Sequence, residues 1–164
     1  MLIIICGLPG SGKTTLAKAL CKALPALHVS SDLMRKRLFP KPAYSEAEKA
    51  RVYSAMMLEA ERALRAGKDV VADATFQRAA RREEFLALAR EMGVRAHVLM
   101  TVLNEEEIRR RLGRRRKGGP SDADFAVYQR MRADFEAPDG EYLVVDSMLP
   151  EQDKLRLALE FVGR

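Results

Sequence analysis

An apolar run followed by a glycine-rich loop near the N-terminus restricts the fold more than any other feature. The run Leu2–Cys6 reads LIIIC, which is typical of a buried strand, and GLPGSGKT follows at residues 7–14. This loop fits the pattern G-x-x-x-x-G-K-[ST], and a helix is predicted over residues 12–24 directly behind it. The order strand, loop, helix predicts an α/β protein that binds a nucleoside triphosphate.

The residue types of the loop explain why it suits a triphosphate. Its glycines let the backbone curl so that N–H groups point at phosphate oxygens, and the helix start adds a positive dipole end. We expect Lys13 to neutralise the outer phosphates and the Thr14 hydroxyl to bind magnesium. ATP and magnesium are therefore the expected cofactors. The predicted nucleotide-binding residues are Gly7, Leu8, Pro9, Gly10, Ser11, Gly12, Lys13, Thr14 and Thr15.

Apolar runs alternate with helical patterns along the 164 residues, which predicts one domain over residues 1–164. Because the strands are almost continuously apolar and are separated by helices, we expect a parallel sheet with helices on both faces. The predicted strands are Leu2–Cys6, Leu27–Ser30, Asp69–Ala72, Val94–Val102 and Glu141–Val145. The predicted helices are 12–24, a short one from about 33, 46–66, 77–92, 105–117, 122–136 and 151–162.

Polar side chains follow each predicted strand. In open α/β sheets ligands bind beyond the carboxyl ends of the strands, so we expect these residues to gather at one edge. After the glycine-rich loop they are Ser31-Asp32, Asp73-Ala74-Thr75, Asn104 and Asp146.

Two aspartates of this set have both a structural and a functional interpretation. Asp32 could cap the short helix LMRKRL, or it could accept a proton from an attacking hydroxyl. Arg35 lies three residues later on the same helix face, where a guanidinium could bind a phosphate or carboxylate of the acceptor. Asp73 could cap the segment from Gln77 or bind magnesium at a strand end. The candidate magnesium ligands are Thr14, Asp32 and Asp73.

The positive charge of the chain is concentrated in one segment. The net charge is +6, but RRRLGRRRK at residues 109–117 holds seven positive charges, so the rest of the chain is at −1. This run could be a solvated helix face. Because it adjoins KGGPSD, we expect instead a lid over residues 109–121 that brings Arg111 and Arg115 to the transferring phosphate.

The remaining composition indicates a cytoplasmic enzyme. No apolar run is long enough to span a bilayer, and MLIIIC carries no positive leader. Cys6 and Cys21 match no metal spacing and are expected to be reduced and buried. His28 and His97 lie in strand-like segments, also without metal spacing, and we assign them no role.

The chain resembles the P-loop kinases of the polynucleotide 5′-kinase and zeta-toxin-like group over residues 2–138. The matching pieces are GLPGSGKTT, VSSDLMRKRL, VVADATF followed by Arg81-Arg82, EEEIRRRLGRR and PSDADFAVYQRMRADFEAP. The resemblance implies a five-stranded sheet in order 2-3-1-4-5. It also implies that Asp32 is the general base, that Arg35 grips a phosphate beside the acceptor hydroxyl, and that Arg111 and Arg115 contact the donor phosphates.

These features together favour an ATP-dependent phosphotransferase. No Asn-Lys-x-Asp guanine signature occurs, and the length leaves no second domain for a motor. Our first hypothesis for the acceptor is the 5′-hydroxyl of a polynucleotide, although only Phe39 and Tyr44 are obvious candidates to stack on a base. The alternatives are a small-molecule kinase for a sugar, nucleoside or antibiotic hydroxyl, and a slow regulatory NTPase. The expected acceptor is thus a nucleic-acid end or a small anionic alcohol, with no membrane partner.

Overall fold

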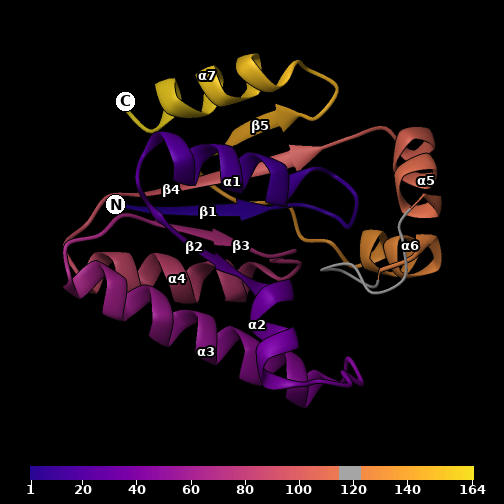
Figure 1. Cartoon of the computed structure of the whole chain (residues 1–164), viewed down its shortest axis with the longest axis horizontal. Helices are drawn as coiled ribbons and strands as arrows, with labels where there is room; N and C mark the ends of the chain where they lie inside the picture. The colour runs from indigo at the N-terminus through magenta and orange to yellow at the C-terminus, as the bar shows by residue number, and fades with distance from the viewer. Residues whose placement is uncertain (115–122) are drawn as a thin grey trace.

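The computed structural model describes residues 1–114 and 123–164. Within these residues, five parallel strands form one sheet in the order β2-β3-β1-β4-β5, as Figure 1 shows. This confirms the predicted α/β fold and its strand order. The strands are β1 (Leu2–Cys6), β2 (Leu27–Ser30), β3 (Val70–Asp73), β4 (Ala96–Val102) and β5 (Leu143–Asp146).

Helices cover both faces of the sheet. Helices α1 and α7 pack on one face and α3 and α4 on the other, while α5 and α6 lie together beyond the carboxyl ends of the strands (Figure 1). The helices are α1 (Lys13–Ala23), α2 (Ser31–Leu38), α3 (Glu46–Arg65), α4 (Ala79–Glu91), α5 (Glu105–Gly113), α6 (Phe125–Ala133) and α7 (Glu151–Phe161). In the described part of the chain, no helix is both long and apolar enough to cross a membrane.

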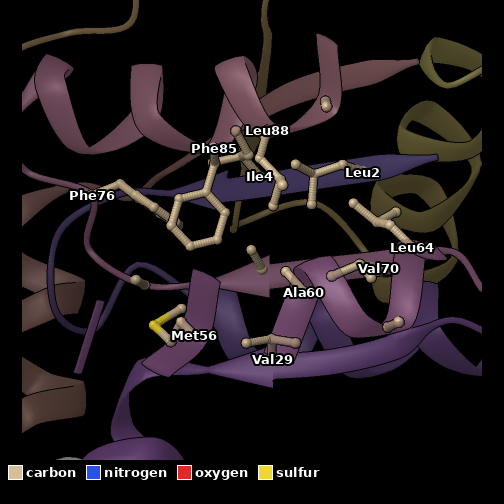
Figure 2. Close-up of a cluster of buried hydrophobic side chains, with 14 of the residues drawn as sticks. Leu2, Ile4, Val29, Met56, Ala60, Leu64, Val70, Phe76, Phe85 and Leu88 are labelled. Carbon is tan, nitrogen blue, oxygen red and sulfur yellow. The ribbon is translucent and has the colours of Figure 1, made fainter. Parts of the chain in front are cut away.

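The apolar run LIIIC supplies both layers of the core. Every residue of β1 is fully buried, and successive side chains point to opposite faces of the sheet. Leu2 and Ile4 pack under α3 and α4, where Figure 2 shows them beside Phe85, whereas Ile3 and Ile5 pack under α1 and α7. Each such side chain contributes about 1.5–3 kcal/mol by its burial. A strand that is apolar at every position is therefore a consequence of its place between two layers.

Several element boundaries differ from the predicted ones because polar groups decide them. Strand β3 begins at Val70, one residue later than predicted, and the carboxylate of the preceding Asp69 accepts a hydrogen bond from the N-terminal amine at 2.6 Å. It ends on Asp73, which pairs with Ile5 and Ser30 in the sheet. Helix α6 is shorter than the predicted 122–136 because the Asp124 side chain caps it, accepting from the Val127 amide at 2.8 Å.

Candidate active site

A cleft of about 1030 Å³ lies at the carboxyl ends of the strands. This volume is at the upper end of the usual range for ligand sites. Ten of the predicted site residues line it, and the cleft therefore brings together segments that are far apart in the sequence. They are Pro9, Gly10, Gly12, Lys13, Thr14, Thr15, Asp32, Arg35, Asp73 and Arg111. Gly7, Leu8 and Ser11 do not line the cleft, and Arg115 lies outside the described residues.

The glycine-rich loop is held from below by two hydroxyl groups. The Ser11 side chain is buried and shares a hydrogen bond of 2.7 Å with the Thr101 hydroxyl at the end of β4. The Ser147 hydroxyl, just after β5, donates to the Ser11 carbonyl. Gly12 has φ +93°, and a Cβ there would lie 2.6 Å from Ser147 Oγ. Neither Thr101 nor Ser147 was predicted, because a single hydroxyl residue carries no motif.

Lys13 begins helix α1 and folds back over the loop. Its Nζ donates to the Leu8 carbonyl at 3.0 Å. The ammonium group therefore lies on the loop itself, whose glycines and helix start are suited to bind phosphate oxygens. The role of Lys13 beside the outer phosphates stays a prediction.

The Thr14 hydroxyl and the Asp73 carboxylate lie side by side at the base of the cleft. Thr14 Oγ1 donates to Asp73 Oδ2 at 2.7 Å, and His28 Nε2 lies 3.2 Å from the same oxygen. Because magnesium prefers hard oxygen ligands and usually takes one or two carboxylates plus substrate phosphates, this pair fits a magnesium site. His28 is a contact that the sequence did not reveal, since no spacing links it to Asp73.

The capping alternative for Asp73 does not hold. Helix α4 begins only at Ala79, and its first amide donates to the Glu136 carboxylate at 2.6 Å. Asp73 is instead almost fully buried at the end of β3 and faces Thr14. Asp32 lies in the first turn of α2 and lines the same cleft.

Arg35 is a buried cation with unused hydrogen-bonding capacity. The residue is 9% exposed, and within residues 1–114 and 123–164 its Nη1 has no hydrogen-bond partner. Glu48 Oε2 forms a long ion pair with Nη1 at 3.8 Å, but this oxygen already accepts a hydrogen bond from the Tyr44 amide at 2.7 Å. A buried charged donor left unpaired is unfavourable, and an anionic ligand in the cleft would remove that penalty.

Of the two predicted stacking aromatics, only one reaches the cleft. The Tyr44 ring lies 5.0 Å from the Arg35 guanidinium carbon and lines the cleft. Phe39 packs against the hydrophobic core, with Arg51 over its ring at 5.1 Å. Phe39 is therefore a partly buried residue that packs against the core and does not line the cleft.

The described part of the predicted lid is packed onto the glycine-rich loop. Ile108 and Leu112 of α5 and Tyr128 of α6 form a small apolar cluster, against which Leu8 of the loop packs. Arg111 lines the cleft at the end of α5.

Glu107 holds the α5 arginines in place. Arg111 Nε donates to the Glu107 carboxylate at 2.9 Å. Hydrogen bonds from Arg110 and Arg111 lower the pKa of Glu107 to about 2, so this carboxylate stays charged at neutral pH. The remainder of the predicted lid and helix, residues 115–121, lies outside the described residues.

Two of the strand-end residues do not join the site, contrary to expectation. Asn104 caps α5 by accepting from the Glu107 amide at 2.8 Å. Asp146 accepts from the Met148 amide at 2.8 Å in the turn after β5. Both side chains thus satisfy local backbone amides, whereas Ser31 and Thr75 do line the cleft.

A protein-family model described as an AAA domain matches residues 2–138. The chain belongs to this family. Its fold is that of P-loop kinases of known structure. The chain matches no curated protein sequence.

Three solved structures illustrate the likeness of this AAA domain to its structural neighbours. The Mycobacterium tuberculosis APS kinase CysC, in complex with AMPPNP and APS, has a TM-score of 0.76 at 16% identity, covering 99% of this chain and 97% of that chain. Kti12 of Chaetomium thermophilum, in complex with ADP-AlF3, has a TM-score of 0.75 at 20% sequence identity, and the match covers 100% of each chain. A gluconokinase from Sinorhizobium meliloti 1021 has a TM-score of 0.71 at 19% sequence identity, and the match covers 99% of this chain and 91% of the gluconokinase chain.

Proposed function

We propose that the protein is an ATP-dependent kinase that transfers the γ-phosphoryl group to a hydroxyl of a small anionic acceptor. The observation that carries this proposal is Arg35, a buried guanidinium whose Nη1 makes no hydrogen bond to any described residue, lining the same cleft as Asp32 and the glycine-rich loop. A nucleotide-binding switch that only hydrolyses ATP needs no buried cation on the side of the cleft opposite its own phosphates.

The residues divide between donor and acceptor. The loop amides and Lys13 hold the triphosphate, and Thr14 and Asp73 would hold magnesium, which supplies positive charge at the outer phosphate oxygens. Asp32 accepts the proton of the acceptor hydroxyl. The hydroxyl oxygen attacks the γ-phosphorus as the bond between this phosphorus and ADP breaks. Arg111 stabilises the charge of the transferred group, and Arg115 is expected to join it.

The small acceptor replaces the polynucleotide 5′-hydroxyl as our leading hypothesis. Two neighbours are named for small acceptors, APS and gluconate, which supports this choice. The polynucleotide stays the second candidate because Tyr44 offers one ring beside Arg35 that could stack on a base.

The test is transfer of label from γ-labelled ATP in the presence of magnesium. We expect label on small anionic alcohols, and weaker transfer to uncharged alcohols of equal size. Label on 5′-hydroxyl oligonucleotides alone would favour the polynucleotide reaction, and release of free phosphate alone would favour a slow regulatory NTPase.

Two variants assign the roles. Asp32→Asn should abolish transfer and leave ATP affinity nearly unchanged, and Arg35→Gln should raise the KM of the acceptor much more than that of ATP. Asp153→Asn, an exposed aspartate on α7, is the matched control and should behave like the unmodified protein. Undiminished turnover of Asp32→Asn would remove Asp32 from the mechanism.

A further inference from the structure

We propose that the acceptor end of the cleft holds a second anion-binding subsite, formed by Arg81 and Arg130, so that the preferred acceptor is an alcohol with two anionic groups. This inference rests on the proposed function, because it names the acceptor class of the same cleft. Both arginines line the cleft, Arg81 from α4 and Arg130 from α6.

Arg81 contacts an aromatic ring and a glutamate but keeps donors that these contacts do not use. Its guanidinium carbon lies 5.3 Å from the centre of the partly buried Tyr53 ring, and the Tyr53 hydroxyl in turn accepts from the Phe76 amide at 3.1 Å. Arg81 Nη1 donates to both oxygens of Glu84, at 3.0 and 3.1 Å. Its Nε and Nη2 make no hydrogen bond to any described residue.

The Glu84 partner does not explain the place of Arg81. Glu84 lies one turn further along α4 and does not line the cleft. A half-exposed ion pair of this kind contributes little to stability. Because the Glu84 carboxylate occupies only Nη1 of Arg81, the Nε and Nη2 atoms can bind a ligand.

Arg130 offers a second cation from a different wall of the cleft. Its side chain is exposed, and within residues 1–114 and 123–164 it has neither an ion pair nor a hydrogen bond. An arginine in a ligand-sized cleft with all of its donors unused is suited to bind a phosphate or carboxylate in two-point fashion.

The other charges of this end largely balance one another. Lys49 donates to Glu46 at 2.6 Å, and Arg78 pairs with Glu136 at 3.0 Å and with Asp134 at 4.0 Å. The Lys49 hydrogen bond and charge lower the pKa of Glu46, and Arg78 and Arg81 lower it further, which places all of them in one neighbourhood. Among the described residues that line this end of the cleft, Arg35, Arg81 and Arg130 keep donors that make no hydrogen bond, and Arg130 has no carboxylate partner at all.

The two proposed anion positions are distinct but close. Arg35 stacks on Tyr44, whereas Arg81 stacks on Tyr53. Burial raises the pKa of Tyr53 to about 12, and the charges of Arg81 and Arg35 both oppose this rise, so both guanidiniums lie near the same phenol. An acceptor with a single anionic group could use one of these positions only, whereas two groups on a small molecule could use both.

The test is a binding measurement on the full chain with the donor site saturated by AMPPNP and magnesium. Calorimetry compares fructose 6-phosphate, with one phosphate, and fructose 1,6-bisphosphate, with two. We expect the bisphosphate to bind about tenfold more tightly, as one further charge-assisted contact predicts. Arg81→Gln and Arg130→Gln should each remove most of this preference without changing the affinity for the monophosphate. Arg35→Gln should weaken both probes.

The matched control is Arg90→Gln, because Arg90 also lies on α4 and pairs with a glutamate of its own helix but does not line the cleft. Equal affinity for the two probes, binding of neither, or an Arg81→Gln effect no larger than that of Arg90→Gln would overturn the subsite. Phosphotransfer is measured separately. If the protein transfers phosphate to no acceptor but still binds the bisphosphate more tightly, the proposed kinase reaction is refuted and the subsite is not. If the protein transfers phosphate to acceptors with a single anionic group, and Arg81→Gln does not change the rate of this transfer, the subsite is refuted and the kinase reaction is not.

Discussion

Replacing Gly12 by alanine should damage the glycine-rich loop by two separate effects that the structure lets us weigh. Gly12 has φ +93°, and a backbone in this region costs an L-residue about 1–2 kcal/mol. The new Cβ would also lie 2.6 Å from Ser147 Oγ, and such overpacking costs about 1–3 kcal/mol. We therefore expect the free energy of unfolding to fall by about 2–5 kcal/mol.

A second substitution separates the two effects. Ser147→Ala removes the hydroxyl oxygen, after which the nearest atom to the new Cβ would be Ser147 Cβ at 3.3 Å. Alone, Ser147→Ala should lower the free energy of unfolding by about 1–2 kcal/mol, because the buried Ser11 carbonyl loses its hydrogen-bond donor. The double variant should be more stable than the sum of the single effects predicts, by about 1–2 kcal/mol, since the steric conflict is gone.

Gly67→Ala serves as the control for backbone conformation. Gly67 has φ +73°, and a Cβ there would meet nothing within 4 Å. Urea denaturation of the four variants and the unmodified protein gives the unfolding free energies from midpoint and slope. Gly12→Ala should cost clearly more than Gly67→Ala. Equal losses at the two glycines, or strict additivity of Gly12→Ala with Ser147→Ala, would refute the steric account.

Two further predictions concern the metal site and the thiols. Thr14→Val should raise the magnesium concentration needed for half-maximal transfer by about tenfold or more, because the hydroxyl next to Asp73 is lost. Thr14→Ser keeps this hydroxyl and should be close to normal. An unchanged magnesium titration of Thr14→Val would exclude Thr14 as a ligand. Burial raises the pKa of Cys6 and of Cys21 to about 11, so in the native protein both thiols should react slowly with a disulfide reagent at pH 8. Their rates should increase up to about pH 11 and become ordinary in urea, and native rates equal to those of free cysteine at pH 8 would contradict this.

The sequence by itself determined the order of elements and much of the cleft. LIIIC is apolar at every position, and only a strand buried on both faces needs that pattern. The loop motif predicted a nucleotide site, and the rule that parallel strands end at one edge predicted that Asp32 and Asp73 lie beside it; both line the same cleft as the loop. The same rule failed for Asn104 and Asp146, because short polar side chains after a strand also serve as local caps. The strand order needed the family resemblance, since each strand alone is compatible with several neighbours.

Only the tertiary structure decided which distant side chains meet in and beneath the cleft. Ser147 reaches the Ser11 carbonyl from 136 positions away, and His28 reaches Asp73 from 45 positions away. Arg81 became a candidate for acceptor binding only when its stacking on Tyr53 was known. Such contacts leave no local signal, because hydrophobic periodicity and capping act over a few residues. They arise when the sheet order and the packing of helices bring distant segments together. For Arg35 this packing left one buried guanidinium nitrogen without a hydrogen bond to the described part of the chain.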